Sequence, residues 1–204
     1  MNPFRNVIFG LAIALTVVGA SASSLFAGEV AVFTFQTGKS KDYQTVAIEL
    51  NSAAAPGTVE NFKILVKKKY YKGMHVHRIA PDYLVQLGDP ESKNLKTRGI
   101  GTKGPGYTLP PEIKLKHEIG SVAMARLPDD INPGRRSNGS QFYVALQPMP
   151  ELDGKYTVFG KVVSGLEFLQ ALSKKAKDTN DMPTEPVKVK SVRLMDSSEL
   201  AVAP

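Results

Sequence analysis

About eight short apolar runs, separated by turn-forming residues, constrain the fold of this chain more than any other feature. Within Thr45–Leu50, for example, Val46, Ile48 and Leu50 alternate with their neighbours, as expected for a strand with one buried face. Most connections between the runs are too short for a crossover helix, so neighbouring strands are expected to pair antiparallel. An antiparallel barrel or sandwich follows. The predicted strands cover residues 29–36, 45–50, 76–80, 83–87, 121–125, 141–146, 156–163 and 187–194.

Two segments have helical periodicity instead. Apolar residues between Val59 and Val66 form one stripe, which predicts a helix from Pro56 to about Tyr70 that Gly73 ends. The second predicted helix is shorter and rests on Leu166, Leu169, Ala171 and Leu172.

Two irregular regions interrupt this pattern. Residues 89–118 are rich in proline and glycine and show little periodicity, which is typical of a functional surface or of a disordered segment. In the last run, the apolar phase set by Val187 and Val189 changes to that of Val192 and Leu194. A β-bulge near Ser191 would explain this change.

The first 27 residues have the order of a secretory signal. Arg5 precedes an uncharged apolar run, Val7–Ala20, which is shorter than the ~20 residues that a spanning helix needs. We therefore expect cleavage after Ala22 or Ala27 in preference to a retained anchor, and export to the periplasm or the medium without stable membrane insertion. The expected division is a signal peptide over 1–27, a folded domain over 28–196 and a C-terminal tail over 197–204.

Charge and cysteine content exclude several classes of function. The chain contains no cysteine, so disulfides, thiolate nucleophiles and cysteine-bound metals are excluded. Its formal net charge of +7 is compatible with an anionic partner. However, Lys67–Lys69 and Lys174–Lys177 have the pattern of solvated helix faces, and no basic stretch is interleaved with aromatic residues. A nucleic-acid partner is therefore not expected.

Two motifs carry more specific information. One is VHRIAPDYLVQLGD at residues 76–89, and the other is NGSQFYVAL at residues 138–146. Both resemble signature stretches of the cyclophilin family, and the resemblance continues in collinear order over about residues 30–195. It implies a mainly β fold, an eight-stranded antiparallel β-barrel capped by two α-helices. It also implies a peptidyl-prolyl cis-trans isomerase that acts on proline-containing polypeptides, without a cofactor, a metal or a covalent intermediate.

The matched arginine suits this chemistry. Rotation about a peptide bond costs ~18–20 kcal/mol because resonance is broken. No bond is made, so a donor fixed near the imide nitrogen favours the twisted transition state over either planar form. Arg78 matches the catalytic arginine of the family, and its guanidinium is always charged. Gln86 matches the glutamine that holds the substrate backbone and orients the arginine.

The resemblance also assigns residues that bind the substrate. The proline ring is expected in an apolar pocket formed by Tyr83, Leu84, Tyr143 and Leu152 and bordered by Tyr156. Backbone contacts are expected from Ala125, Arg126 and Leu127, and further groove contacts from Gln141 and Gly101. Phe142, next to Tyr143, is expected to point into the barrel.

The chain departs from the family pattern at several positions. Tyr83 and Tyr143 stand where phenylalanine is commoner, and each adds a hydroxyl that needs a partner. Glu151 stands where many members carry the tryptophan that binds cyclosporin, so strong binding of that drug is not expected. Tyr156 replaces a histidine of eukaryotic members. Residues 127–137 exceed the usual turn, which predicts an extra surface loop beside the groove.

The same sequence also suggests other functions. His75 and His77 could share a strand face and bind zinc, although no third ligand is recognisable. A hydrolase could be assembled from Ser140, His117 and Asp153, although no nucleophile-elbow motif is present. A non-catalytic proline-peptide binding or chaperone module on the same fold is the strongest alternative, and a scaffold subunit of an envelope assembly is a further one. A monomer is expected.

Overall fold

The computed structural model describes residues 28–200; the predicted signal peptide and the last four residues lie outside this range. The helices are α1 (Pro56–Lys67), α2 (Leu166–Ser173) and α3 (Ser197–Leu200), with 3-10 turns η1 (Pro90–Lys93) and η2 (Pro150–Leu152). The strands are β1 (Glu29–Thr37), β2 (Tyr43–Leu50), β3 (Arg78–Ala80), β4 (Leu84–Leu87), β5 (Thr108–Leu109), β6 (Ser121–Met124), β7 (Ser137–Asn138), β8 (Phe142–Ala145), β9 (Val158–Ser164) and β10 (Val187–Asp196).

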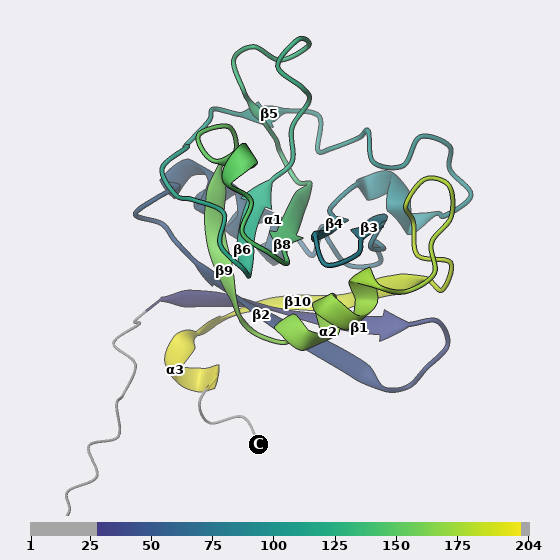
Figure 1. Ribbon diagram of the computed structural model, residues 1–204. Coiled ribbons are helices and arrows are strands. Elements are labelled where there is room, and N and C mark those ends of the chain that lie inside the picture. Colours follow the sequence, from purple (N-terminus) through teal and green to yellow (C-terminus); the bar gives the residue numbers. More distant parts are fainter. Residues whose placement is uncertain (1–27, 201–204) are drawn as a thin grey trace, which may run out of the picture.

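Eight of the strands form one antiparallel sheet in the order β10-β1-β2-β9-β6-β8-β4-β3 (Figure 1). The sheet curls, and its two edges approach each other just ahead of β3. There His75 forms a β-bridge with Lys188 of β10, and the Val76 N–H donates to the Val187 carbonyl at 2.9 Å. The mainly β prediction of eight antiparallel strands with two packed helices is confirmed in this curled form.

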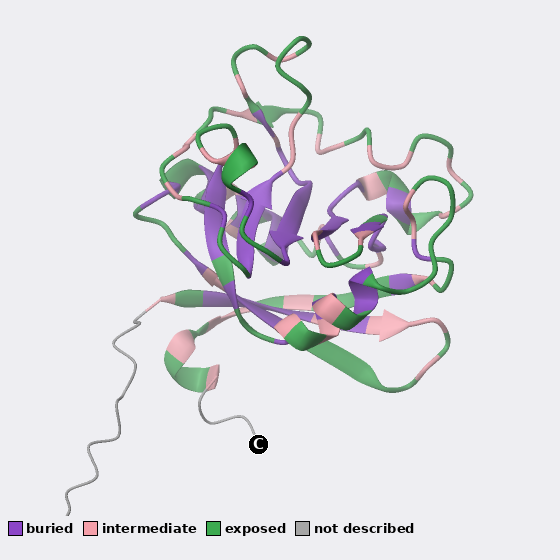
Figure 2. Cartoon of the chain, in the orientation of Figure 1, coloured by how far each residue is buried: buried purple, intermediate pink, exposed green. Residues whose placement is uncertain are grey.

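Aromatic rings fill the interior of the curled sheet. Phe33, Phe62, Phe142 and Phe159 are at most 1 % exposed, and the ring centroids of Phe62 and Phe159 are 5.2 Å apart. Strands β4, β6 and β8 are buried along their whole length (Figure 2). Helix α1 packs on β10, and α2 packs on β2, β3 and β4. The predicted inward orientation of Phe142 is confirmed.

The predicted bulge in β10 is also confirmed. Thr34 of β1 is opposite Ser191, whereas Phe35 is opposite Val189, so Lys190 is the additional residue. The bulge keeps apolar side chains directed inward on both sides of the change in phase.

The end of the first helix differs from the prediction. Helix α1 stops at Lys67, because Lys69 adopts a left-handed conformation with φ of +55°. The Tyr70 N–H then donates to the Leu65 carbonyl and the Lys69 N–H donates to the Val66 carbonyl. This is a Schellman ending that usually carries glycine at the position of Lys69.

The predicted tail over 197–204 begins instead with a short helix, α3. The Asp196 carboxylate accepts hydrogen bonds from the backbone N–H and the hydroxyl of Ser198, which caps this helix. Between residues 28 and 200, no helix is both long enough and apolar enough to cross a bilayer.

Candidate active site

Two adjoining pockets lie on the outer face of the sheet. Side chains alternate along β8, so Phe142 and Val144 belong to the interior core, whereas Tyr143 and Ala145 belong to a second cluster. The first pocket has a volume of about 270 Å³ and is lined by Arg78, Tyr83, Leu84, Gln86, Ala125, Arg126, Tyr143, Leu152 and Tyr156. The second, of about 560 Å³, shares Gln86, Ala125 and Arg126 and adds the predicted residues Gly101, Leu127 and Gln141. All twelve residues predicted from the sequence therefore lie along one continuous groove.

Arg78 and Gln86 are cross-strand partners on β3 and β4, so their side chains lie on the same face. Arg78 Nη1 donates to Gln86 Oε1 at 3.3 Å, and Gln86 Nε2 donates to Gln141 Oε1 at 2.9 Å. Gln86 is buried, whereas the Arg78 side chain is 45 % exposed, with its Nε 3.9 Å from the Asp181 carboxylate. The Gln86 amide, which Gln141 holds in place, thus orients the Arg78 guanidinium.

A buried carboxylate organises the loop beside Gln141. Asp89 has no exposed surface, and its Oδ2 accepts hydrogen bonds from the N–H groups of Gly101 and Lys103 at 2.6 and 2.9 Å. Gln141 Nε2 donates to the carbonyls of the same two residues, at 3.0 and 2.6 Å. The irregular stretch of the sequence is therefore ordered in this region, and it forms one wall of the second pocket.

Two residues that were not predicted make this arrangement possible. Gly88 has φ of +105°, and a Cβ atom there would lie 2.3 Å from the Ser140 carbonyl oxygen, so only glycine fits. Asn138 Oδ1 accepts hydrogen bonds from the N–H groups of Ser140 and Gln141. The Asn-Gly dipeptide at residues 138–139 is a turn signal that the sequence itself offers. Asp89 has no such local signal, because its partners, Gly101 and Lys103, lie more than ten residues further along the loop.

The hydroxyl of Tyr143 has a buried partner. It lies 2.9 Å from His117 Nε2, and His117 Nδ1 lies 3.0 Å from Asp153 Oδ1. The network assigns the Nδ1 proton to the bond with Asp153, so Nε2 accepts the tyrosine proton. Burial raises the pKa of Tyr143 well above its ordinary value. Ser140 instead donates to the Gly88 carbonyl, so the three groups of the hydrolase alternative are not brought together.

The other two tyrosines of the first pocket also have partners. The Tyr83 hydroxyl donates to Glu151 Oε1 at 2.9 Å, and partial burial together with this carboxylate raises the pKa of Tyr83. The guanidinium of Arg126 lies 4.5 Å from the centroid of the Tyr156 ring, in a cation–π contact. The pocket is thus aromatic on its walls and polar at its rim.

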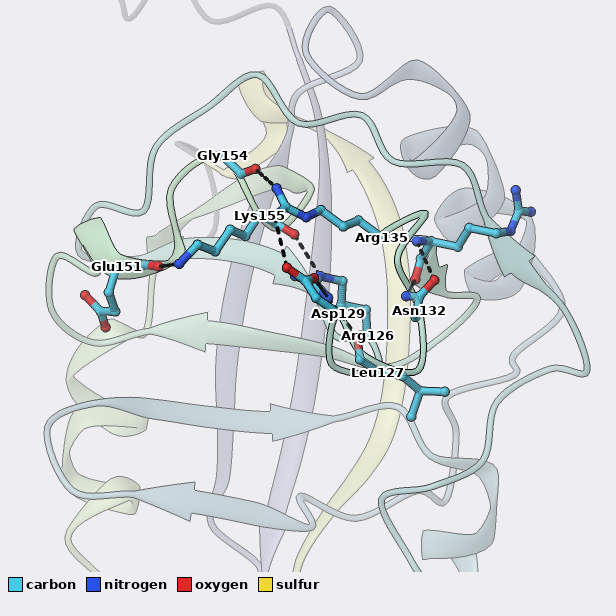
Figure 3. Close-up of polar contacts among 9 residues, drawn as sticks. Arg126, Leu127, Asp129, Asn132, Arg135, Glu151, Gly154 and Lys155 are labelled. Atoms are coloured by element: carbon cyan, nitrogen blue, oxygen red, sulfur yellow. Dashed lines mark hydrogen bonds and ion pairs between the residues drawn. The ribbon is translucent and has the colours of Figure 1, made fainter.

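The predicted extra loop is fastened to the groove by arginines (Figure 3). Arg126 Nε donates to the Lys155 carbonyl at 2.8 Å, and its Nη1 lies 2.7 Å from Asp129. Asp129 also pairs with Arg135, which donates to the Gly154 carbonyl. The Arg126 side chain is only 3 % exposed, and its contacts connect the loop to the turn at residues 154–155.

The two histidines near Arg78 do not form a recognisable metal centre. His75 Nδ1 lies 2.6 Å from the Ser92 carbonyl oxygen, whereas neither ring nitrogen of buried His77 has a hydrogen-bond partner. Burial lowers the pKa of His77 to about 4. Across residues 28–200, no group of three or more histidine, cysteine or carboxylate side chains could hold a metal ion.

Comparisons with known proteins agree with this geometry. Residues 32–194 match the family model described as cyclophilin type peptidyl-prolyl cis-trans isomerase/CLD. The chain is 41 % identical to peptidyl-prolyl cis-trans isomerase ppi1 of Schizosaccharomyces pombe over 147 residues, which are 71 % of this chain and 88 % of the relative. It is 40 % identical to peptidyl-prolyl cis-trans isomerase B of Bacillus subtilis over 136 residues, which are 65 % of this chain and 86 % of the relative.

A solved structure extends the comparison to three dimensions. The crystal structure of a cyclophilin type peptidyl-prolyl cis-trans isomerase from Cryptosporidium parvum superimposes with a TM-score of 0.68 and 27 % identity. The match covers 82 % of this chain and 97 % of the other. By its fold, its groove and its sequence, the chain belongs to the cyclophilin-type peptidyl-prolyl cis-trans isomerase family.

Proposed function

We propose that the chain catalyses cis-trans isomerisation of X–Pro bonds in polypeptides, with Arg78 as the donor to the imide nitrogen. The observation that carries the proposal is the exposed Arg78 guanidinium, which Gln86 and Gln141 orient above an aromatic pocket. Family membership and the names of the relatives support the same activity.

In this mechanism the groove stabilises the twisted imide more strongly than either planar form. When the C–N bond rotates, the nitrogen regains a lone pair, which can accept a hydrogen bond from the fixed guanidinium. The pocket formed by Tyr143, Leu84 and Leu152 would hold the proline ring while the preceding carbonyl rotates. An acceleration of about 10⁵-fold would require about 7 kcal/mol of differential binding.

The main alternative is a proline-peptide binding or chaperone module that does not accelerate exchange. A binding module needs the aromatic pocket but has no need of a donor held at the pocket rim. The relay from Arg78 through Gln86 to Gln141 therefore favours the enzyme.

We also propose that the enzyme acts on exported polypeptides and works as a monomer. The support for export is the charged start and apolar run of residues 1–27, with cleavage after Ala22 or Ala27. Slow proline exchange can limit the folding of secreted chains, which gives such an enzyme a role outside the cytoplasm. Mass spectrometry of the amino terminus recovered from the exported fraction tests the cleavage.

A coupled isomerisation assay with a chromogenic X–Pro peptide tests the activity. The full chain should accelerate cis-to-trans exchange in proportion to its concentration. A well-folded chain that binds the peptide in a calorimeter but leaves the exchange rate at its uncatalysed value would contradict the enzyme hypothesis. That result would support the hypothesis of a binding module.

A further inference from the structure

A cluster of lysines lies outside the groove, where α1 ends and β10 begins. Lys69, Lys72, Lys188 and Lys190 line a single pocket of about 390 Å³, together with Gly73 and Val189. Three of these lysines also line a neighbouring pocket of about 200 Å³. Neither pocket has an acidic residue in its lining, and we call the two together the lysine pocket.

No ion pair of residues 28–200 balances the charge of the lysine pocket, although the Lys190 ammonium lies 5.9 Å from the centroid of the Tyr43 ring on β2. Residues 61–81 and 186–195 contain no aspartate or glutamate. Among the ion pairs formed by residues 28–200, none involves any of the four lysines. Lys67 and Lys68 are exposed beside them at the end of α1. Like charges that line one hollow repel each other, and a bound anion offsets this repulsion.

Two irregularities of the backbone place lysines at this pocket. Lys69 occupies the left-handed position that ends α1, where glycine would be free of steric strain. Lys190 is the additional residue of the bulge in β10, and bulges redirect side chains. Strained positions that carry a particular side chain are found preferentially at functional sites.

We propose that the lysine pocket binds a phosphate-bearing anion with two or more negative charges. Lysine ammonium groups are compact point charges with rotatable donors, which suits phosphate oxygens. Four exposed lysines around one open hollow of about 390 Å³ offer several donors to a single phosphate group. None of its residues lines either groove pocket, so the proposal goes beyond the isomerase function.

The phosphate could belong to a free polyphosphate or to an anionic lipid headgroup, and two arms of one experiment distinguish these sources. The full chain is titrated with inorganic tripolyphosphate in a calorimeter, in buffer without phosphate. It is also sedimented with phosphatidylcholine vesicles that contain or lack phosphatidylglycerol. Saturable binding of tripolyphosphate would assign a free phosphate, and binding only to vesicles with phosphatidylglycerol would assign a headgroup.

The double variant Lys69→Gln/Lys190→Gln should weaken the binding about 25-fold, at about fivefold for each lysine. The matched control Lys96→Gln/Lys175→Gln removes the same charge from exposed lysines outside the pocket and should leave the affinity within about twofold. Circular dichroism verifies the fold of each variant. Absence of binding by the folded wild-type chain in both arms, or an equal loss in the control pair, would overturn the proposal.

Lys69→Gly separates ligand binding from a structural role. Glycine relieves the left-handed strain, so the variant should unfold about 2–8 °C higher while its affinity for the anion falls. If Lys69 had only a structural role, the thermal midpoint would rise without any loss of affinity for the anion. A lower thermal midpoint with unchanged affinity would contradict the assignment of Lys69 to the site.

Discussion

The hydrogen bond between Tyr143 and His117 gives a sharp test of how the pocket is held. Tyr143→Phe keeps the aromatic ring, and therefore the pocket wall, but removes the hydroxyl. His117 Nε2 then loses its partner in a place that water does not reach, because the His117 side chain has no exposed surface. An unsatisfied buried acceptor costs about 1–3 kcal/mol, so the free energy of unfolding should fall by that amount.

Tyr83→Phe is a matched control for this change. It also deletes one tyrosine hydroxyl from the first pocket, but the partner, Glu151, is exposed and can bind water instead. The cost should be under about 0.5 kcal/mol. Urea unfolding followed by circular dichroism, with equal slopes for all proteins, measures both values. For a domain of this size, each kcal/mol corresponds to about 2–4 °C in the thermal midpoint.

Equal losses in Tyr143→Phe and Tyr83→Phe would refute the reasoning. That result would mean that burial of His117 does not make its acceptor costly to leave unpaired. A loss in Tyr143→Phe that His117→Phe does not modify in the double variant would contradict it as well, because contacting residues should be energetically coupled.

Three further predictions concern other parts of the structure. Gln86→Leu removes the support of the Arg78 guanidinium, and kcat/KM for a proline peptide should fall about 10- to 150-fold, since bonds to charged groups contribute about 1.5–3 kcal/mol; an unchanged value would contradict the relay. His77 has a folded-state pKa of about 4, below its unfolded value of about 6.5. The unfolded chain therefore binds more protons between these values, and the free energy of unfolding should fall as pH drops from 6.5 to 4, by up to about 1.4 kcal/mol per pH unit. Buried His75, whose pKa is also lowered by burial, adds to the same slope. In His77→Leu the slope should be shallower, and an identical slope would reject the assignment. Asp129→Ala removes the carboxylate that pairs with Arg126 and Arg135, so limited proteolysis should cut residues 127–137 faster than in the wild type.

The sheet was predictable from the sequence because its signals are local. Short apolar runs predict all eight strands of the main sheet, and the phase change in Val187–Leu194 predicts the bulge near Ser191, one residue from the unpaired Lys190. The short pair β5 and β7 has no such signal, since each strand has two residues and depends on a partner about thirty positions away. The early end of α1 depends on a lysine adopting a conformation that sequence patterns reserve for glycine.

The positions of the groove residues were predictable from the motifs, but their partners were not. A tyrosine in place of phenylalanine at position 143 signals only that a hydroxyl needs a partner. That His117 supplies it depends on the path of residues 89–118, which Asp89 fixes through backbone contacts that no local pattern reveals. The lysine pocket was missed for the same reason. The run Lys67–Lys69 has the sequence pattern of a solvated helix face, whereas the fold brings Lys188 and Lys190 beside Lys69 from the other end of the chain.

The role of Arg78 is tested most directly by measuring kcat/KM for a proline peptide in the wild type, Arg78→Lys and Arg78→Ala. The Arg78 side chain is half exposed, so both variants should fold, as circular dichroism would verify. Loss of one preorganised donor typically lowers turnover about 10²–10³-fold, which we expect for Arg78→Ala. Arg78→Lys keeps the charge without the planar fork and should remain well below the wild type. A folded Arg78→Ala that stays within about twofold of the wild type would contradict the proposed mechanism.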